Sequence, residues 1–361
     1  MKKTKLILGI ETSCDDTSVS ILRDSDNFPE VLVHLKQGQE DILAKWGGVV
    51  PEIAARNHLE CLAPLIKTAL DQSKTTAQEL DLIAVTALPG LLGPLLTGMN
   101  AAKTMSLIHK KPIVPVNHLY AHLEAIHLTE KINYPYLGLL ISGGHSIYFW
   151  VESSQDFHVL GSTIDDAAGE AFDKGGKILN LGYPAGHIID QLAKFGDPAK
   201  YSFPIGLKSS ADARLSFSGL KTSLRVFCEK NPEILEKRPS QYKDKEKLSQ
   251  DFYDLCASYQ DSISKALLLK LRYAIKIAQD KFQAPQNVTI IVGGGVACNS
   301  RIRELLNQKH SHSYFVKPEY CTDNGVMIAN YGLRTFDTAI KYPESLKLDA
   351  RGRFINKKDH I

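Results

Sequence analysis

The pattern of apolar and polar segments along the chain predicts an α/β protein. Short apolar runs, each of a length typical of a buried strand, occur at 6–10, 17–22, 136–141, 146–151 and 288–292. Longer segments with helical spacing of apolar residues lie between them, at 53–70, 98–108, 117–128, 165–179 and 248–282. Strands that alternate with helices are typical of domains in which helices cover a sheet.

One strand–turn–strand pattern occurs twice. The strand at 6–10, the polar turn at 11–16 and the strand at 17–22 are matched by the strand at 136–141, the turn Ser142-Gly143-Gly144-His145 and the strand at 146–151. A chain of 361 residues also exceeds the length at which one core usually stops growing. We therefore predict two related lobes, an N-terminal lobe of residues 1–133 with 325–361 and a C-terminal lobe of residues 134–324.

Composition places the chain among globular proteins of the cytoplasm. Hydrophobic residues make up 43% and charged residues 23% of the sequence, and the six cysteines are scattered without CxxC pairs, so we expect reduced thiols. No apolar run reaches the length of a membrane span, which predicts a cytoplasmic protein without a membrane partner. The formal net charge of +3 neither requires nor excludes a nucleic-acid partner.

Two histidines are the first candidates for chemistry. His118 and His122 are four residues apart in a predicted helix, so they project from one face and can chelate a metal, although a half-buried polar stripe fits the same spacing. An HExxH metalloprotease would need glutamate where the chain has Leu119.

Carboxylates offer further candidates. Asp323 precedes the helical pattern at 326–335, where a helix cap is the ordinary interpretation; as a third metal ligand beside the histidines it would leave coordination positions open. Asp166, Glu170 and Asp173 form an acidic stripe if a helix starts at 165, facing either solvent or the hydroxyl groups of a ligand. Glu11 and Asp15 could accept a proton, but a structural or cation-facing role fits both equally well, so no catalytic residue is assigned.

Several short motifs, taken together in this order, resemble those of one family. They are GIETSCD (9–15), GGVVPE (47–52), SGGH (142–145), DDAAGEAFDK (165–174), FSGLKT (217–222) and CTDNG (321–325), together with the two histidines. The sequence resembles, over nearly its whole length, the bacterial tRNA threonylcarbamoyladenosine transferases, once described as O-sialoglycoprotein endopeptidases. That family belongs to the actin, sugar-kinase and heat-shock-ATPase superfamily, which implies two actin-like (ribonuclease-H-like) lobes with a ligand cleft between them.

The resemblance implies two sets of site residues. His118, His122 and Asp323 look like the ligands of one divalent metal per chain, with Fe(II) favoured and Zn possible. The expected contacts to the nucleotide substrate are Leu140, Ile141, Ser142, Gly143, Gly144, Asp173, Gly186, Asp190 and Asn299. The chain departs from the family at Leu88 and Ala185, where glycine is usual, so the local geometry near those two turns is an open question.

The resemblance also implies a reaction and partners. The family transfers the threonylcarbamoyl group from threonylcarbamoyl-AMP to N6 of the adenosine next to the anticodon, in tRNAs that read codons starting with A. The expected partners are tRNA, threonylcarbamoyl-AMP, an inactive paralogue subunit and a small ATPase subunit. Two alternatives on the same fold are a small-molecule kinase, against which the histidine pair argues, and a nucleotide-dependent scaffold.

Overall fold

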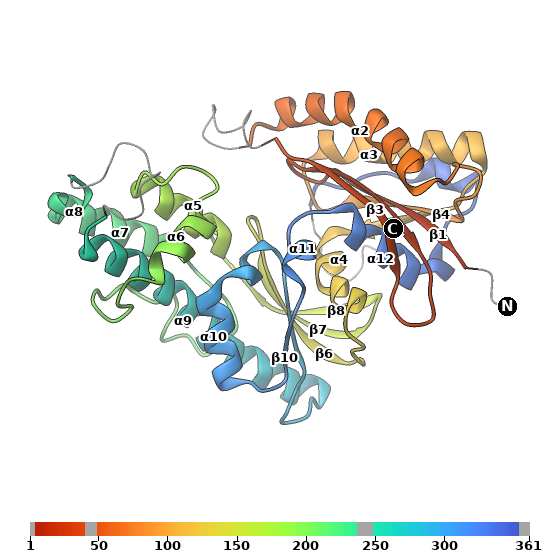
Figure 1. Cartoon of the computed structure of the whole chain (residues 1–361). Helices are drawn as coiled ribbons and strands as arrows, with labels where there is room; N and C mark the ends of the chain where they lie inside the picture. The colour runs from red at the N-terminus through yellow and green to blue at the C-terminus, as the bar shows by residue number, and fades with distance from the viewer. Residues whose placement is uncertain (1–3, 40–48, 237–247, 354–361) are drawn as a thin grey trace. The chain divides into compact units, whose positions relative to one another are not determined.

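The computed structural model describes residues 4–39, 49–236 and 248–353. The chain divides into two compact units and forms two five-stranded sheets, the first in unit 1 and the second in unit 2 except for residues 151–157 at the ends of β7 and β8. Unit 1 comprises Met1–Tyr134, Val151–Phe157 and Val316–Ile361, and unit 2 comprises Pro135–Trp150 and His158–Phe315. Figure 1 shows both units and labels many of their helices and strands. The first two residues of the 47–52 motif lie outside the described residues.

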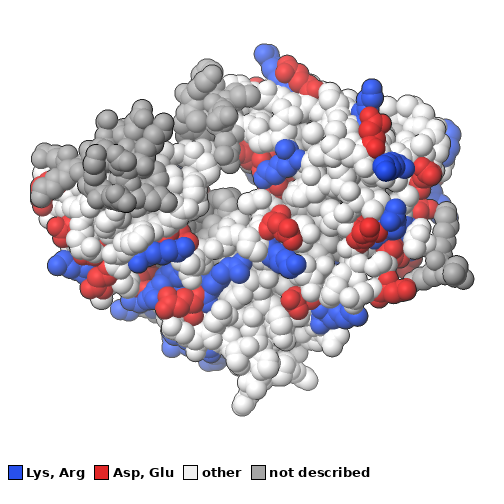
Figure 2. All heavy atoms as spheres, in the orientation of Figure 1, with Lys and Arg blue, Asp and Glu red and all other residues white. Residues whose placement is uncertain are grey.

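The surface carries charges of both signs. Figure 2 shows Lys and Arg side chains interspersed with Asp and Glu over the visible face, in agreement with the small net charge of +3. Within the described part of the chain, no helix has the length and apolar character that crossing a membrane requires.

The sheet of unit 1 has the strand order β3-β2-β1-β4-β5. Its strands are β1 Leu6–Glu11, β2 Thr17–Arg23, β3 Glu30–Gln37, β4 Leu82–Leu88 and β5 Ile113–Asn117. β1 pairs antiparallel with β2 and parallel with β4, and β4 pairs parallel with β5. Its described helical segments are α2 Pro51–Ser73, α3 Leu92–His109, α4 His118–Glu124, η2 Ala125–Leu128, α11 Pro318–Cys321, α12 Gly325–Arg334, η5 Phe336–Thr338 and η6 Glu344–Lys347.

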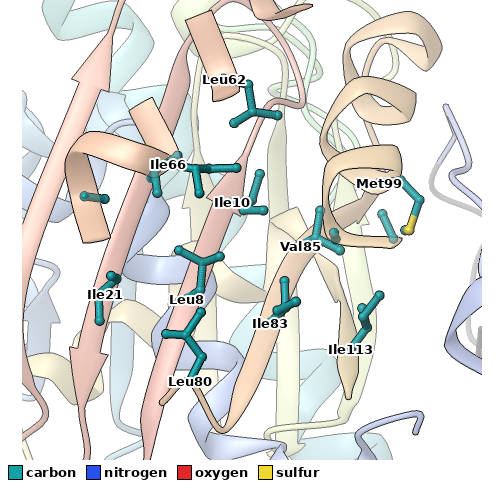
Figure 3. Close-up of a cluster of buried hydrophobic side chains, with 14 of the residues drawn as sticks. Leu8, Ile10, Ile21, Leu62, Ile66, Leu80, Ile83, Val85, Met99 and Ile113 are labelled. Carbon is teal, nitrogen blue, oxygen red and sulfur yellow. The ribbon is translucent and has the colours of Figure 1, made fainter. Parts of the chain in front are cut away.

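Alternating side chains of β1 face two different layers of helices. On one face Leu8 and Ile10 pack with residues of α2 and α3, including Leu62, Ile66 and Met99 (Figure 3). On the other face Gly9 lies against α12: a Cβ placed on Gly9 would be 2.2 Å from the Gly325 carbonyl oxygen. Because β1 has no side chain there, α12 packs directly on the sheet and brings its N-terminal end next to the strand.

The sheet of unit 2 has the order β10-β9-β6-β7-β8. Its strands are β6 Tyr136–Ile141, β7 Ser146–Ser153, β8 Asp156–Ser162, β9 Ile290–Gly293 and β10 Ser313–Phe315. β9 pairs parallel with both β6 and β10. Counted from β8, the order is third, second, first, fourth and fifth strand, which is also the order of unit 1. The predicted relation between the two lobes is therefore confirmed at the level of strand order.

Helices of unit 2 carry most of the motifs that follow β6. They are α5 Ala168–Ile178, α6 Gly186–Ala193, α7 Ser218–Lys230, α8 Pro232–Glu236, α9 Gln250–Phe282, η4 Gly295–Cys298 and α10 Ser300–Lys309. The predicted start of a helix at 165 is wrong, because α5 begins at Ala168. Asp166 thus precedes the helix, where it accepts hydrogen bonds from Lys174 and Lys221, and the predicted acidic stripe does not form.

Candidate functional site

The two candidate histidines lie on α4, which follows β5 without a loop. The Asn117 side chain caps the helix by accepting a hydrogen bond from the Leu119 N–H at 3.0 Å, as the residue type at that position predicts. His118 and His122 are both buried. Their ring centroids are 4.6 Å apart in an edge-to-face arrangement, and because both rings are buried the half-buried polar stripe considered above is excluded.

Asp323 is not a helix cap. The cap of α12 is its neighbour Asn324, whose side chain accepts a hydrogen bond from the Met327 N–H at 2.8 Å. The interpretation of Asp323 as the cap is therefore wrong by one residue. This cap leaves the Asp323 carboxylate directed at the histidines of α4, with Oδ1 lying 3.1 Å from His122 Nε2 and 3.6 Å from His118 Nε2.

The three side chains converge with the geometry of metal ligands. His118 Nε2 and His122 Nε2 are 3.1 Å apart, and both face Asp323 Oδ1. Ligand atoms about 2.0–2.2 Å from one ion lie about 3.0 Å apart at a right angle and about 3.4 Å apart at a tetrahedral angle. The observed separations fit that range, so the described residues include a group able to hold a metal ion. Its donor set does not by itself identify the metal.

Glu11 supports this group from behind. Its Oε2 lies 2.9 Å from His118 Nδ1 and accepts a hydrogen bond from Thr86 Oγ1 at 2.7 Å, while its Oε1 accepts one from the Ser13 N–H at 2.5 Å. A carboxylate accepts, so His118 Nδ1 carries a proton, and in the neutral ring the lone pair is on Nε2, the nitrogen that faces the cluster. Metal-binding histidines usually have such an outer partner. The sequence left open whether Glu11 accepts a proton or has a structural or cation-facing role, and it did not link Glu11 to His118.

The electrostatics of the group favour a cation. Burial disfavours the charged imidazole of His118, but the Glu11 and Asp323 carboxylates raise its pKa to about 9. Burial alone would raise the pKa of the Asp323 carboxyl, yet His118 and His122 hold that pKa well below its usual value. Burial also raises the pKa of the nearby Asp16 to about 7, against the opposing charge of Lys36. Carboxylates crowded in this way are stabilised by positive charge.

The candidate substrate residues all lie in unit 2. The turn after β6 is closed by a hydrogen bond from the Ser142 N–H to the His145 carbonyl oxygen at 2.8 Å. Gly143 and Gly144 are exposed, and a Cβ placed on either would meet no atom within 4 Å. The start of α5 packs against this turn, because the Gly169 N–H donates to the Ser142 carbonyl oxygen at 3.2 Å. An exposed glycine turn can approach the oxygen atoms of a ligand closely.

Two aspartates connect the next candidates. Asp173 Oδ1 accepts a hydrogen bond from the Ala185 N–H at 2.9 Å, which fastens the start of α6 at Gly186 to α5. Asp190 Oδ1 accepts hydrogen bonds from both the N–H and the hydroxyl of Ser300. Through these bonds α5, α6 and the start of α10 form one connected part of unit 2.

Asn299 joins the same part of unit 2 at the start of α10. It is the cap of that helix, and its amide also donates to Gln260 Oε1 at 2.8 Å. The Asn299 side chain therefore caps α10 and also links it to α9.

Neither departure from the family glycines distorts the backbone. Ala185 has φ −101° and ψ −14°, which any residue adopts, and its methyl group occupies the space left by Gly176, where an added Cβ would lie 2.0 Å away. Leu88 ends strand β4 in extended conformation, with its side chain in the core between the sheet and α2 and α3. Both side chains are buried in their own units.

The overall fold has structural relatives of low sequence identity. Component A of the (R)-2-hydroxyglutaryl-CoA dehydratase of Acidaminococcus fermentans is 14% identical and superimposes with a TM-score of 0.50, covering 91% of this chain and 97% of that protein. Full-length HypF is 11% identical, with a TM-score of 0.52 over 91% of this chain and 46% of HypF. The matched strand orders and these relatives define the class: an α/β protein of two actin-like units, here with a group of side chains able to hold a metal.

Sequence comparison identifies the family within that class. The family model described as tRNA N6-adenosine threonylcarbamoyltransferase matches residues 30–330. Proteins of that description from Lawsonia intracellularis and Thermosipho africanus are each 41% identical to the chain, over 91% and 95% of its length and 91% and 98% of theirs. The chain belongs to the tRNA N6-adenosine threonylcarbamoyltransferase family. Its activity is the transfer of a threonylcarbamoyl group to N6 of adenosine in tRNA, which excludes the kinase and scaffold alternatives as its principal function.

Proposed function

We propose that unit 1 supplies a metal centre and unit 2 supplies the contacts to the donor nucleotide in this transfer. The donor is threonylcarbamoyl-AMP, and the acceptor is the adenosine next to the anticodon in tRNAs that read codons starting with A. The observation that carries the proposal is the convergence of His118 Nε2, His122 Nε2 and Asp323 Oδ1 in a chain that belongs to this family.

The reaction needs a carbonyl carbon held against a weak nucleophile. The lone pair of N6 attacks the carbamoyl carbon of the mixed anhydride, the bond from that carbon to the phosphate oxygen breaks, and AMP leaves with the electron pair. N6 loses one proton to the surrounding medium or to a base. Holding the two reactants in line and stabilising the oxygen that becomes negative contribute most to such a transfer.

His118, His122 and Asp323 would hold the metal. Two imidazoles and one carboxylate leave coordination positions open, a set that suits Fe(II) and that Zn tolerates, so we favour iron and keep zinc as the second choice. When bound, the ion supplies Lewis-acid chemistry to oxygen atoms of the substrate. Glu11 keeps the His118 proton on Nδ1 and thereby keeps Nε2 available as a ligand.

The residues of unit 2 would orient the donor. The strand end Leu140–Ile141 and the turn Ser142–Gly144 lead into an exposed backbone whose N–H groups can donate to phosphate or carbonyl oxygens. Asp173 uses one oxygen for the Ala185 N–H, and a carboxylate accepts several hydrogen bonds, so it can also accept from a ribose hydroxyl.

The other members would frame the same nucleotide. Gly186 offers close backbone approach at the start of α6. Asp190 joins α6 to the start of α10 by accepting from Ser300, and Asn299 caps α10. We assign all of these residues to binding and none to proton transfer.

Purified chain, metal-free and reloaded, tests the proposal. It is given threonylcarbamoyl-AMP labelled in the threonine, unmodified tRNA and the partner proteins proposed below, and the tRNA nucleosides are analysed by mass spectrometry. We expect transfer only with the metal-loaded chain, and loss of both metal and transfer in His122→Ala and Asp323→Ala. Equal transfer by the metal-free chain would refute the role of the metal centre while leaving the family assignment intact.

The chain is also proposed to work with other proteins in the cytoplasm. Tight RNA binding uses several phosphate contacts, whereas 43 Lys and Arg against 40 Asp and Glu leave little surplus charge. We propose that an inactive paralogue and a small ATPase subunit complete the complex and supply part of the tRNA surface. Multiple turnover by the chain alone, unchanged on adding those proteins, would refute this requirement.

A further inference from the structure

Helix α2 buries one polar residue in the middle of its apolar face. The face that packs on the sheet consists of residues at helical spacing, and the buried ones are Ala54, His58, Leu62, Ile66 and Ala69. His58 is fully buried among these aliphatic side chains. A leucine would fit such a position by periodicity alone, and burying an imidazole costs free energy unless both of its nitrogens find partners.

Both nitrogens of His58 have partners, and both partners lie in one turn. His58 Nε2 is 3.1 Å from the Cys14 carbonyl oxygen, and His58 Nδ1 is 2.7 Å from Thr17 Oγ1. A carbonyl oxygen only accepts, so Nε2 carries the proton. Burial lowers the pKa of His58, so the ring is neutral and its Nδ1 accepts the hydrogen bond of the Thr17 hydroxyl. One side chain thus holds both ends of the segment 14–17.

The residues just before this segment contact the metal ligand His118. Glu11 Oε2 accepts from His118 Nδ1 at 2.9 Å, and Ser13 Oγ lies 3.2 Å from the same nitrogen. On its other side the turn is held by the Leu91 N–H, which donates to the Ser13 carbonyl oxygen at 2.8 Å. The position of Glu11 and Ser13 against His118 therefore depends on how the turn is anchored to α2 and α3.

We propose that His58 is a positioning residue of the metal centre, acting through the turn between β1 and β2. His58 fixes the positions of Cys14 and Thr17. The turn that contains these residues then holds Glu11 and Ser13 against His118 Nδ1. The inference rests on the proposed metal centre and adds a residue from a different helix to it. Outer partners of metal ligands typically change metal affinity by about 10–100-fold. His58 acts one contact further out, so we expect a loss of about 10-fold when its hydrogen bonds are removed.

Two substitutions at this position separate hydrogen bonding from packing. His58→Leu places an apolar side chain on the buried face of α2 but removes both hydrogen bonds, whereas His58→Gln provides an amide that can donate and accept. Leu62→Ala is the matched control, because it truncates the next buried residue of α2, one turn along, without touching the turn between β1 and β2. Thr17→Val removes only the hydrogen-bond partner of His58 Nδ1 and replaces His58→Leu in the test if that variant does not fold.

The measurements are the dissociation constant for Fe(II) or Zn by chelator competition, the melting temperature, and kcat and KM for transfer. For His58→Leu we expect about 10-fold weaker metal binding and a lower kcat at saturating metal with little change in KM for the donor. His58→Gln should recover most of the affinity, and Leu62→Ala should lower the melting temperature alone. Thr17→Val should weaken metal binding in the same direction.

Two outcomes would count against different proposals. If His58→Leu and Thr17→Val bind metal like the unsubstituted chain while their melting temperatures fall, His58 is a packing residue and the inference is overturned. If the unsubstituted chain binds no metal, the proposed metal centre is refuted. The same holds if the His122→Ala variant binds metal as tightly as the unsubstituted chain. The two failures are distinguishable because failure of the metal centre is detected in proteins in which His58 is unchanged.

Discussion

Replacing Arg334 with methionine should destabilise unit 1 by about 3 kcal/mol, because it leaves a buried carboxylate without its cation. The Glu124 carboxylate is 0% exposed and accepts hydrogen bonds from Arg334 Nε and from the Tyr134 hydroxyl, both at 2.6 Å. Glu124 ends α4 and Arg334 ends α12. The ion pair therefore joins the two helices whose other ends lie next to the metal ligands.

The magnitude follows from what remains after the substitution. Breaking a buried ion pair by removing one partner costs about 3–5 kcal/mol. Tyr134 still donates to the carboxylate, and the Arg334 side chain is 26% exposed, so water reaches part of the site; both facts favour the lower end of that range. Methionine keeps the aliphatic length of arginine, so little packing is lost.

Glu124→Gln in the same chain should recover much of the loss. It removes the unpaired charge and keeps an acceptor for Tyr134. The double-mutant cycle should therefore give a coupling energy of about 2 kcal/mol, within the range known for side chains in direct contact.

Native-state hydrogen exchange of amides in α4 and α12 is the suitable assay, since a chain of two units need not unfold in one step. Urea unfolding at several wavelengths supplies the global value, and the metal content of each variant shows whether loosening the helices reaches the ligands. An effect of Arg334→Met within about 0.5 kcal/mol, the size expected for a surface change, would refute the reasoning, as would strict additivity in the double variant.

Three further outcomes follow from the same contacts. His122→Ala should lower metal affinity by more than about 100-fold, beyond the loss typical of an outer partner, with His109→Ala as a control histidine of α3. Asp173→Ala should weaken binding of an adenine nucleotide in calorimetric titration and leave metal content unchanged; equal affinity would remove the ribose assignment. Hydrogen bonds from Lys174 and Lys221 outweigh burial and lower the pKa of Asp166, so its contribution to stability should be complete above the ordinary aspartate pKa of about 3.9 and disappear as pH falls below it, with the loss smaller in Asp166→Asn.

Much of the fold was readable from local patterns. The buried strands predicted at 6–10 and 136–141 correspond to β1 and β6, because an apolar run of that length between polar turns is shorter than a typical helix and is typical of a buried strand. Helix starts were less reliable. The sequence predicts a helix that starts at Asp165, but the Asp165 carboxylate accepts hydrogen bonds from the N–H groups of Phe217 and Ser218 at the start of α7, a distant contact that no local propensity encodes.

The sequence predicted the candidate site in part, again where the signal lies in residues close together along the chain. Spacing alone places His118 and His122 on one helical face, and the motifs in their order give the family. The sequence could not distinguish Asp323 from Asn324 as the cap of α12, because both residue types cap helices. Packing of α12 on Gly9 beside α4 decided that Asn324 turns back to the helix while Asp323 faces the histidines.

The sequence by itself determined the α/β class, the repeated strand–turn–strand pattern, the histidine pair and, through its ordered motifs, the family. These features depend on residues close together along the chain or on motifs recognisable without any contact. Only the tertiary structure decided that Glu11 orients His118, that His58 of α2 holds the turn beside it, and that Glu124 pairs with Arg334. Each of these depends on a buried polar group finding a partner far away in sequence, and that choice is made when the sheet and its covering helices pack together.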